Sequence, residues 1–202
     1  MLRSSEILVS TAKSKVLTFT ASAAFVCAAA VSVATCYARD LAGVTMPEHV
    51  STSGKQLRLN GMGVGTRAFF NVYVIALYLE KPTSDARAAI KADAVKRIVL
   101  TMLRDVSRER FVQAVEKDMM HNPGVPMAAL RGRLDLLESV LPALKKGNVL
   151  DFTYLPVRGT LVRDQSREIT IPGKDFADAL FSIWLGPQSS NPALQYQLLG
   201  GP

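Results

Sequence analysis

GMGVGTRAFFNVYVIALYLE, residues 61 to 80, is the part around which this 202-residue chain is organised. From Ala68 to Leu79 the residues are mostly aromatic or β-branched, with no Pro and no Gly. This composition is typical of a long buried strand, so we predict a central β-strand over residues 68 to 79. The spacing of Gly61, Gly63 and Gly65 does not fit a phosphate-binding loop. These glycines are instead expected to permit a bend or a bulge before the strand.

Alternation along this strand places polar groups among hydrophobic ones. Side chains two residues apart share a face, so we expect Arg67, Phe69, Asn71 and Tyr73 on one side of the sheet. A cation, an amide and a phenol on an otherwise apolar face are typical of a ligand-pocket wall. The same amide and phenol could equally be satisfied polar groups of an ordinary sheet. Spacing alone leaves both interpretations open.

The first 38 residues have the pattern of an export signal. Three basic residues precede an uncharged, apolar or small stretch from Val16 to Thr35, and Cys36 and Ala38 supply small residues before a cleavage point. We predict cleavage after Ala38 and a periplasmic or secreted protein with no stable membrane insertion afterwards. A retained membrane anchor is the alternative, because the uncharged stretch approaches the ~20 residues that span a bilayer.

Residues 39–202 are expected to form a single domain that rests on its hydrophobic core. Both cysteines, Cys27 and Cys36, lie in the leader, so disulfides and thiolate chemistry are excluded from the rest of the chain. After the leader, 21 basic and 16 acidic residues remain, a net charge of +5. These charges are scattered, so we expect no binding to nucleic acid.

The remaining segments predict an α+β fold. A strand over 55–60 leads into the central strand, and later strands are expected at 96–103, 148–155, 160–163 and 168–171. Helices are expected at about 84–92, capped by Thr83 or Ser84, at 107–121, capped by Asp105 or Ser107, at 127–141 and at 176–184, before a short helix or tail. This order is not an alternating βαβ series. We therefore predict an antiparallel sheet with helices mainly on one face.

Residue types that carry common catalytic chemistry are scarce. The only histidines are His49 and His121, and there is no H-x-x-x-H pattern and no G-x-S-x-G elbow. We expect no metal site, no cofactor and no Ser-His-Asp catalysis. Arg104 and Asp105 are expected to tie a strand to the following helix, as an ion pair or a helix cap.

Four motifs resemble the bacterial chalcone isomerase-like proteins, a branch of the chalcone isomerase superfamily. They are LNGMGVGTRAFFNVYVIALYLE (59–80), LRDVS (103–107), KKGNVLDFTYLP (145–156) and IPGKDFADALFSIWLG (171–186). The resemblance covers the chain from about Gly43 to Gly200. It implies an open-faced β-sandwich, in which a large antiparallel sheet is covered by a helical layer with a ligand cleft between them.

The family implies two activities. Plant chalcone isomerases close a chalcone to a flavanone, with an Arg that stabilises the developing enolate. Other members are non-catalytic and bind fatty acids, using an Arg and a Tyr for the carboxylate. The resemblance places the functional Arg at Gly65, the isomerase Tyr at Leu103 and the isomerase Thr at Ile183, whereas the carboxylate-binding Tyr is kept as Tyr73. Arg67 would replace the missing Arg.

We therefore expect a non-catalytic binder of an elongated apolar or amphipathic ligand, such as a fatty acid, whose site comprises Phe69, Asn71, Tyr73, Arg67 and Leu103. The alternatives are an intramolecular lyase of the chalcone isomerase type and a structural or partner-binding periplasmic protein with a filled cleft. The sequence carries no signal for an oligomeric state.

Overall fold

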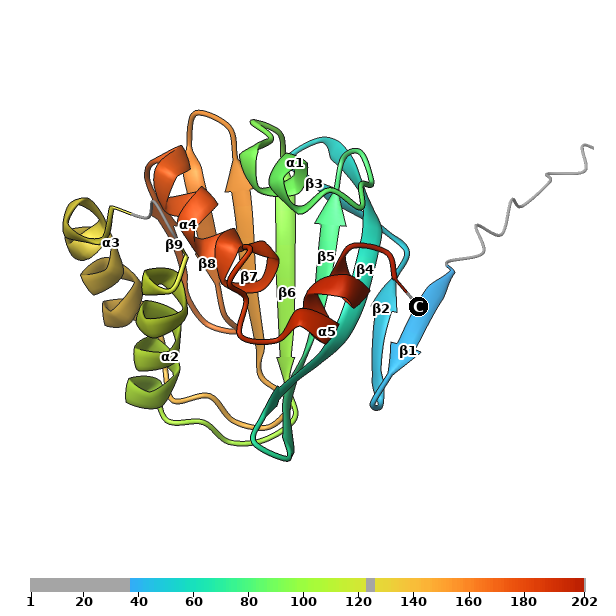
Figure 1. The fold of residues 1–202 in the computed structure, drawn as a ribbon, viewed down its shortest axis with the longest axis horizontal. Coiled ribbons are helices and arrows are strands. Elements are labelled where there is room, and N and C mark those ends of the chain that lie inside the picture. Colours follow the sequence, from blue (N-terminus) through green and yellow to red (C-terminus); the bar gives the residue numbers. More distant parts are fainter. Residues whose placement is uncertain (1–36, 123–125, 202) are drawn as a thin grey trace, which may run out of the picture. The chain divides into compact units, whose positions relative to one another are not determined.

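A curled, antiparallel seven-stranded sheet forms the centre of the protein, seen in a computed structural model that describes residues 37–122 and 126–201 (Figure 1). The strand order follows the chain: β3 (His49–Thr52), β4 (Lys55–Arg67), β5 (Phe70–Leu79), β6 (Lys96–Met102), β7 (Val149–Leu155), β8 (Gly159–Arg163) and β9 (Glu168–Ile171). A separate hairpin is made of β1 (Ala38–Leu41) and β2 (Val44–Pro47). Apart from its last two residues, the predicted leader lies outside the described residues.

In the part of the chain that the structure describes, five helices lie on one face of the sheet, as predicted (Figure 1). They are α1 (Ala86–Lys91), α2 (Arg108–Met120), α3 (Met127–Val140), α4 (Lys174–Leu185) and α5 (Pro192–Leu198). Each predicted helix and strand is present, and the α+β class is confirmed. All lie within a few residues of their expected bounds except the strand predicted over 55–60, which continues to Arg67. Ser107 caps α2, one of the two residues predicted for that position.

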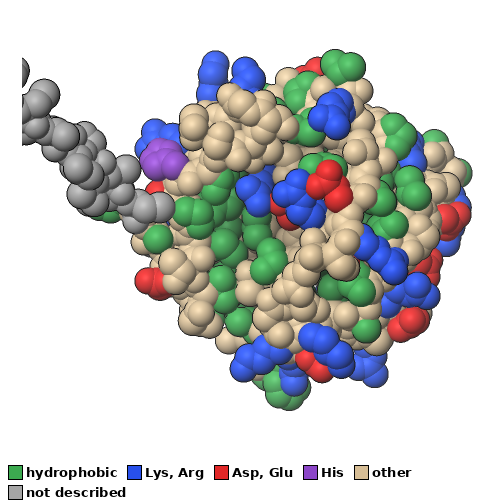
Figure 2. Space-filling model, turned by 180° about the vertical axis from the view of Figure 1, so that it is seen from behind, with side chains coloured by type: hydrophobic (Ala, Val, Ile, Leu, Met, Phe, Trp, Pro, Cys, Tyr) green, Lys and Arg blue, Asp and Glu red, His purple; other side chains and the backbone are tan. Residues whose placement is uncertain are grey.

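Alternation along the strands separates two apolar layers. On the helix side, Ile75, Leu77 and Leu79 of β5 are buried against α2, α3, α4 and α5. On the other side, Val74, Ala76 and Tyr78 pack with residues of β4 and of the β1–β2 hairpin, including Met46. Figure 2 shows this second face, where hydrophobic side chains gather beside charged groups. Among the described residues, no helix is both long and apolar enough to cross a bilayer.

Two local predictions are wrong. The central strand begins at Phe70 rather than Ala68, because Ala68 and Phe69 form the tight turn of a β4–β5 hairpin. Ala68 has a positive φ of 52° in this turn. The predicted cap of α1 is also displaced, because the side chain of Asp85, not Thr83 or Ser84, accepts the backbone N–H bonds of Arg87 and Ala88.

The glycines of the motif lie within β4 rather than in a loop before the strand. The pairing of β4 with β5 shifts between Leu59 and Gly61 and again between Gly65 and Thr66, so the expected irregularity is present. A Cβ at Gly61 would overlap the backbone of α5, and one at Gly63 would overlap Gln197. The absence of side chains at these glycines therefore lets the C-terminal helix lie directly on the strand.

Candidate functional site

A cavity of about 500 Å³ lies between one end of the sheet and helices α2 and α4. We call it the Tyr73 cavity. The strands contribute Arg67, Phe70, Val72 and Tyr73, and the segment after β6 contributes Arg104, Asp105 and Val106. The helices contribute Arg110, Phe111, Ala114, Val115, Asp118, Ile183 and Trp184. Its volume falls within the range of roughly 300–1,000 Å³ that is usual for small-molecule sites.

A bulge in β5 decides which strand residues reach this cavity. Gly65 pairs with Tyr73 and Thr66 pairs with Asn71, so Val72 is an extra residue on β5. One extra residue reverses the alternation of faces. As a result Phe70 and Val72, and not Asn71, line the cavity together with Tyr73.

Gly65 provides the space that the Tyr73 ring occupies. A Cβ built at Gly65 would overlap the ring atoms of Tyr73, so the phenol lies across the neighbouring strand. The position that the family resemblance gives to a functional Arg is therefore filled by an aromatic ring.

The Tyr73 hydroxyl is held at a fixed point on the cavity wall. Trp184 of α4 donates its indole Nε1–H to the Tyr73 oxygen over 3.0 Å. Burial raises the pKa of Tyr73 above its usual value, and it outweighs the lowering effects of this hydrogen bond and of the Arg67 charge. The phenol is therefore protonated at neutral pH. Because its oxygen accepts from Trp184, its own O–H is left to donate to a ligand.

Three arginines line the same cavity as this phenol. Arg67 forms an ion pair of 2.7 Å with Asp118, a carboxylate on α2 whose side chain is 11% exposed. Arg104 stacks on Phe70, with 4.4 Å between its guanidinium carbon and the ring centroid. In the part of the chain that the structure describes, no ion pair involves Arg104 or Arg110. Arg67 is thus neutralised by Asp118, and the other two guanidinium groups carry net positive charge at the cavity.

The structure brings together two of the five predicted site residues, Arg67 and Tyr73. Phe69 is 99% exposed at the hairpin turn, so it does not line the cavity. Asn71 is exposed because the bulge removes it from the cavity face. Leu103 packs in the apolar layer on the opposite face of the sheet. The structure therefore places these three residues outside the Tyr73 cavity. The expectation for Phe69 and Asn71 assumed unbroken alternation through a turn and a bulge, whereas Leu103 came from the family resemblance.

Among the lining residues that the sequence did not assign to the site, Asp118 and Trp184 are the direct partners of Arg67 and Tyr73. Asp118 is a carboxylate on the buried side of α2, spaced three and seven residues after Val115 and Phe111. A charge within an apolar helical stripe was the signal that could have found it. Trp184 lies at the end of the helix expected at 176–184, and the signal there is its indole N–H, which needs a partner when it is buried.

Arg104 and Asp105 do not link β6 to α2 in the way that the sequence predicted, because each has other partners. Asp105 accepts from Lys145 Nζ over 3.0 Å and from the backbone N–H of Lys146 over 2.9 Å. It therefore links the β6–α2 connection to the α3–β7 connection. Arg104 takes no part in this link and contacts Phe70 instead.

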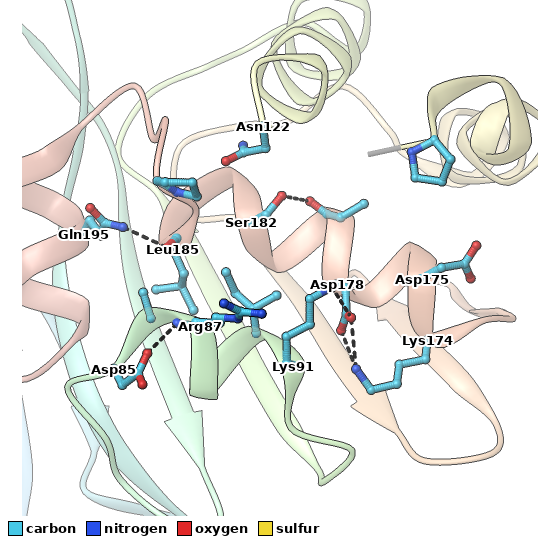
Figure 3. Close-up of a pocket in the computed structure, with 15 residues that line it drawn as sticks. Asp85, Arg87, Lys91, Asn122, Lys174, Asp175, Asp178, Ser182, Leu185 and Gln195 are labelled. Atoms are coloured by element: carbon cyan, nitrogen blue, oxygen red, sulfur yellow. Dashed lines mark hydrogen bonds and ion pairs between the residues drawn. The ribbon is translucent and has the colours of Figure 1, made fainter. Parts of the chain in front are cut away.

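A second and larger cavity, of about 760 Å³, lies beside another face of α4 (Figure 3). We call it the Asp178 cavity. Asp178 accepts from Lys91 over 3.0 Å and from Lys174 over 2.8 Å, and its carboxylate lies 3.6 Å from the buried Lys96. Lys96 also donates to the last carbonyl groups of α1, those of Ala89, Ile90 and Ala92. The Asp178 carboxylate is thus paired with three lysines and is not available to a ligand. We therefore base the candidate site on the Tyr73 cavity.

We next consider groups of side chains that could bind a metal ion. Within 37–122 and 126–201, no group of three or more His, Asp or Glu side chains is placed to hold an ion. The polar groups that line the Tyr73 cavity are a protonated phenol, three guanidinium groups and two carboxylates, and they face apolar side chains.

Comparisons with known proteins agree with this architecture. A family described as "Chalcone isomerase-like" matches residues 38–200, so the chain belongs to the chalcone isomerase-like family. The crystal structure of a fatty-acid binding protein from Arabidopsis thaliana is similar, with a TM-score of 0.62 and 13% sequence identity, over 81% of this chain and 96% of that chain. At this identity the similarity concerns the fold. No curated protein sequence matches the chain.

Proposed function

We propose that this protein is a non-catalytic binder of an elongated apolar ligand with a carboxylate group, such as a fatty acid. The observation that carries the proposal is the Tyr73 cavity, an apolar space of about 500 Å³ in which one phenol O–H and two arginines have no acidic partner among the described residues. A cavity of this size argues against a cleft filled by side chains.

The charges indicate how such a ligand would lie. Three arginines and two aspartates line the cavity, and both aspartates have basic partners. A carboxylate would restore neutrality beside Arg104 and Arg110 and accept the Tyr73 O–H, because charge-assisted hydrogen bonds to a carboxylate are among the strongest. The apolar part would lie along Val72, Val115 and Ile183.

The positions that the family resemblance links to isomerisation support binding rather than catalysis. Gly65 carries no cation, and the Tyr73 ring occupies its space. Leu103 lies on the other face of the sheet, and Ile183 offers only an apolar side chain to the cavity. Losing one preorganised donor costs about 3 kcal/mol of transition-state stabilisation.

Ligand content of the purified protein tests the proposal. Native mass spectrometry and lipid extraction should detect a bound fatty acid in the wild type and a strong loss in the Tyr73→Phe, Arg67→Ala double variant. A matched control is Tyr196→Phe, Arg131→Ala, which removes the same groups from the exposed side of α5 and from a surface ion pair on α3. Full ligand content in the Tyr73 variant, or flavanone formation from a chalcone above the spontaneous rate, would contradict the proposal.

We also propose that the protein is exported, on the pattern of its first 38 residues. N-terminal sequencing of the protein isolated from its own cells would show a mature chain that begins at Arg39. A first residue at Met1 would indicate a retained leader and contradict the proposal.

A further inference from the structure

The β4–β5 turn presents two aromatic side chains to solvent. Phe69 is 99% exposed and Phe70 is 58% exposed. Neither the turn geometry nor the core requires a phenylalanine at position 69, since the side chain buries almost no surface in the fold. Exposed adjacent aromatic residues at the tip of a protruding turn are typical of an interaction surface.

Basic residues surround this turn. Three connections meet at the same end of the sheet: residues 66–70, residues 103–110 and residues 141–148 (Figure 1). They contain six basic and two acidic residues, a net charge of +4. By contrast, residues 80–95, which join β5 to β6 at the opposite end, contain three basic and three acidic residues and have no net charge.

Contacts hold these three connections together. Arg104 stacks on Phe70, the backbone N–H of Leu103 donates to Val72, and Asp105 binds Lys145. Figure 2 shows the result at its lower end, where hydrophobic side chains protrude with basic side chains on either side. The aromatic tip and the cations therefore form one surface, which we call the Phe69 end.

We propose that the Phe69 end docks on a lipid bilayer that contains anionic headgroups. Phe69 and Phe70 would enter the boundary between headgroups and acyl chains, while Arg104, Lys145 and Lys146 would lie among the headgroups. This combination of inserted aromatic side chains and surrounding cations is how peripheral proteins bind anionic membranes.

The shape of this surface favours a bilayer over a protein partner. A stable protein interface needs roughly 800 Å² on each partner and a surface of matching shape. The Phe69 end offers a narrow convex tip with two adjacent aromatic side chains. A bilayer can take up such a tip without a matching surface, and its headgroups complement the net charge of +4.

Docking in this way has a consequence for the Tyr73 cavity. Phe70 and Arg104 belong both to the Phe69 end and to the cavity lining. The docked protein would therefore hold the mouth of its cavity against the lipid surface. The proposal goes beyond ligand binding, because docking itself requires no ligand in the cavity.

Vesicle co-flotation tests the proposal with no ligand added. The purified protein should float with phosphatidylcholine vesicles that contain about one-third phosphatidylglycerol, bind pure phosphatidylcholine more weakly, and dissociate at high salt. Phe69→Ser should weaken binding to the anionic vesicles about tenfold, because one inserted aromatic side chain is lost. Its thermal midpoint should stay unchanged, since Phe69 is exposed in the fold.

Two matched controls make the test specific. Val157→Ser removes an equally exposed hydrophobic side chain from the β7–β8 turn at the opposite end of the sheet and should leave binding unchanged. Lys146→Glu should weaken binding, whereas Lys81→Glu, at the opposite end, should have a much smaller effect. Equal binding by the Phe69→Ser and Val157→Ser variants would overturn the proposal, and so would self-association in solution that Phe69→Ser abolishes without any vesicle binding by the wild type.

The two proposals can fail separately. Loss of vesicle binding with ligand retained in the Phe69→Ser variant supports docking at this end as a separate function. Vesicle binding by a wild-type protein that contains no fatty acid would sink the proposed function and leave docking intact.

Discussion

The Tyr73 cavity and the Asp178 cavity lie beside the same helix, α4, but differ in what their polar groups do. In the Asp178 cavity one carboxylate is shared by Lys91, Lys174 and the buried Lys96. In the Tyr73 cavity one ion pair accompanies a phenol and two arginines that have no acidic partner in the described chain. The first arrangement satisfies a buried charge and supports the fold, and the second leaves hydrogen-bond donors for a ligand. Volume alone would have selected the Asp178 cavity.

From this difference we expect the largest loss of stability in Asp178→Asn. The variant leaves the Lys96 ammonium, 1% exposed, without its counterion, and breaking a buried ion pair costs about 3 kcal/mol. Urea unfolding would measure the change. Asp175→Asn on the same helix is the control, because its pair with Arg133 is half-exposed and should contribute less than about 1 kcal/mol. Equal losses in the two variants would remove the distinction.

The pH dependence of the free energy of unfolding should reveal the lowered pKa of the buried Lys96. Burial lowers the pKa of Lys96 from 10.5 to about 8 in the fold. Between these values the unfolded chain binds more protons than the folded one, so the free energy of unfolding rises with pH. From pH 8 to pH 10 the wild type should gain about 2 kcal/mol relative to Lys96→Met.

The measurement should stop near pH 10. Burial raises the pKa values of Tyr78 and Tyr154 from 10.0 to about 12. Above pH 10 these phenols ionise in the unfolded chain before they ionise in the fold, so the free energy of unfolding falls. Because both proteins contain the tyrosines, their difference isolates Lys96. Parallel pH profiles for wild type and Lys96→Met would show that the fold does not lower the pKa of Lys96.

The smallest effect on stability is expected at the Tyr73 cavity. Arg67→Gln removes the ion pair with Asp118, but the Arg67 side chain is 51% exposed, so the cost should be below about 1 kcal/mol. Ligand content should fall nonetheless, because the Asp118 carboxylate would be left without its counterion in the cavity and would repel the ligand carboxylate. Arg131→Gln, whose pairs are at the surface of α3, should match the stability change and keep the ligand. A loss of stability as large as that of Asp178→Asn would show that the Arg67 ion pair mainly supports the fold.

The order of elements was predictable because hydrophobic periodicity records burial. The stripe of Phe111, Val112, Val115 and Met119 predicted α2, and all four residues are buried in the helix-side layer. The β4–β5 turn was not predicted because Ala68 and Phe69 lack the Gly, Asn or Asp that usually marks a turn. An apolar residue at positive φ has no sequence signature.

The site was predictable only where local geometry sufficed. Tyr73 lies on the face that strand alternation assigns to it, and Arg67 reaches the cavity from the neighbouring strand, opposite Phe70. The exclusion of Asn71 depends on one extra residue in β5, and the Trp184 hydrogen bond joins positions 111 residues apart. Neither a bulge nor a long-range partner can be read from spacing along one strand.

The packing of α5 on β4 joins the C-terminal part of the chain to a strand near its N-terminal part. Asn60 donates to the carbonyl of Leu198 over 2.8 Å, and the two residues are separated by 138 positions. The glycines of β4 are therefore covered only once residues 192–198 pack against them. A chain truncated before Pro192 would leave this part of the β4 backbone exposed, so α5 completes the domain rather than merely extending it.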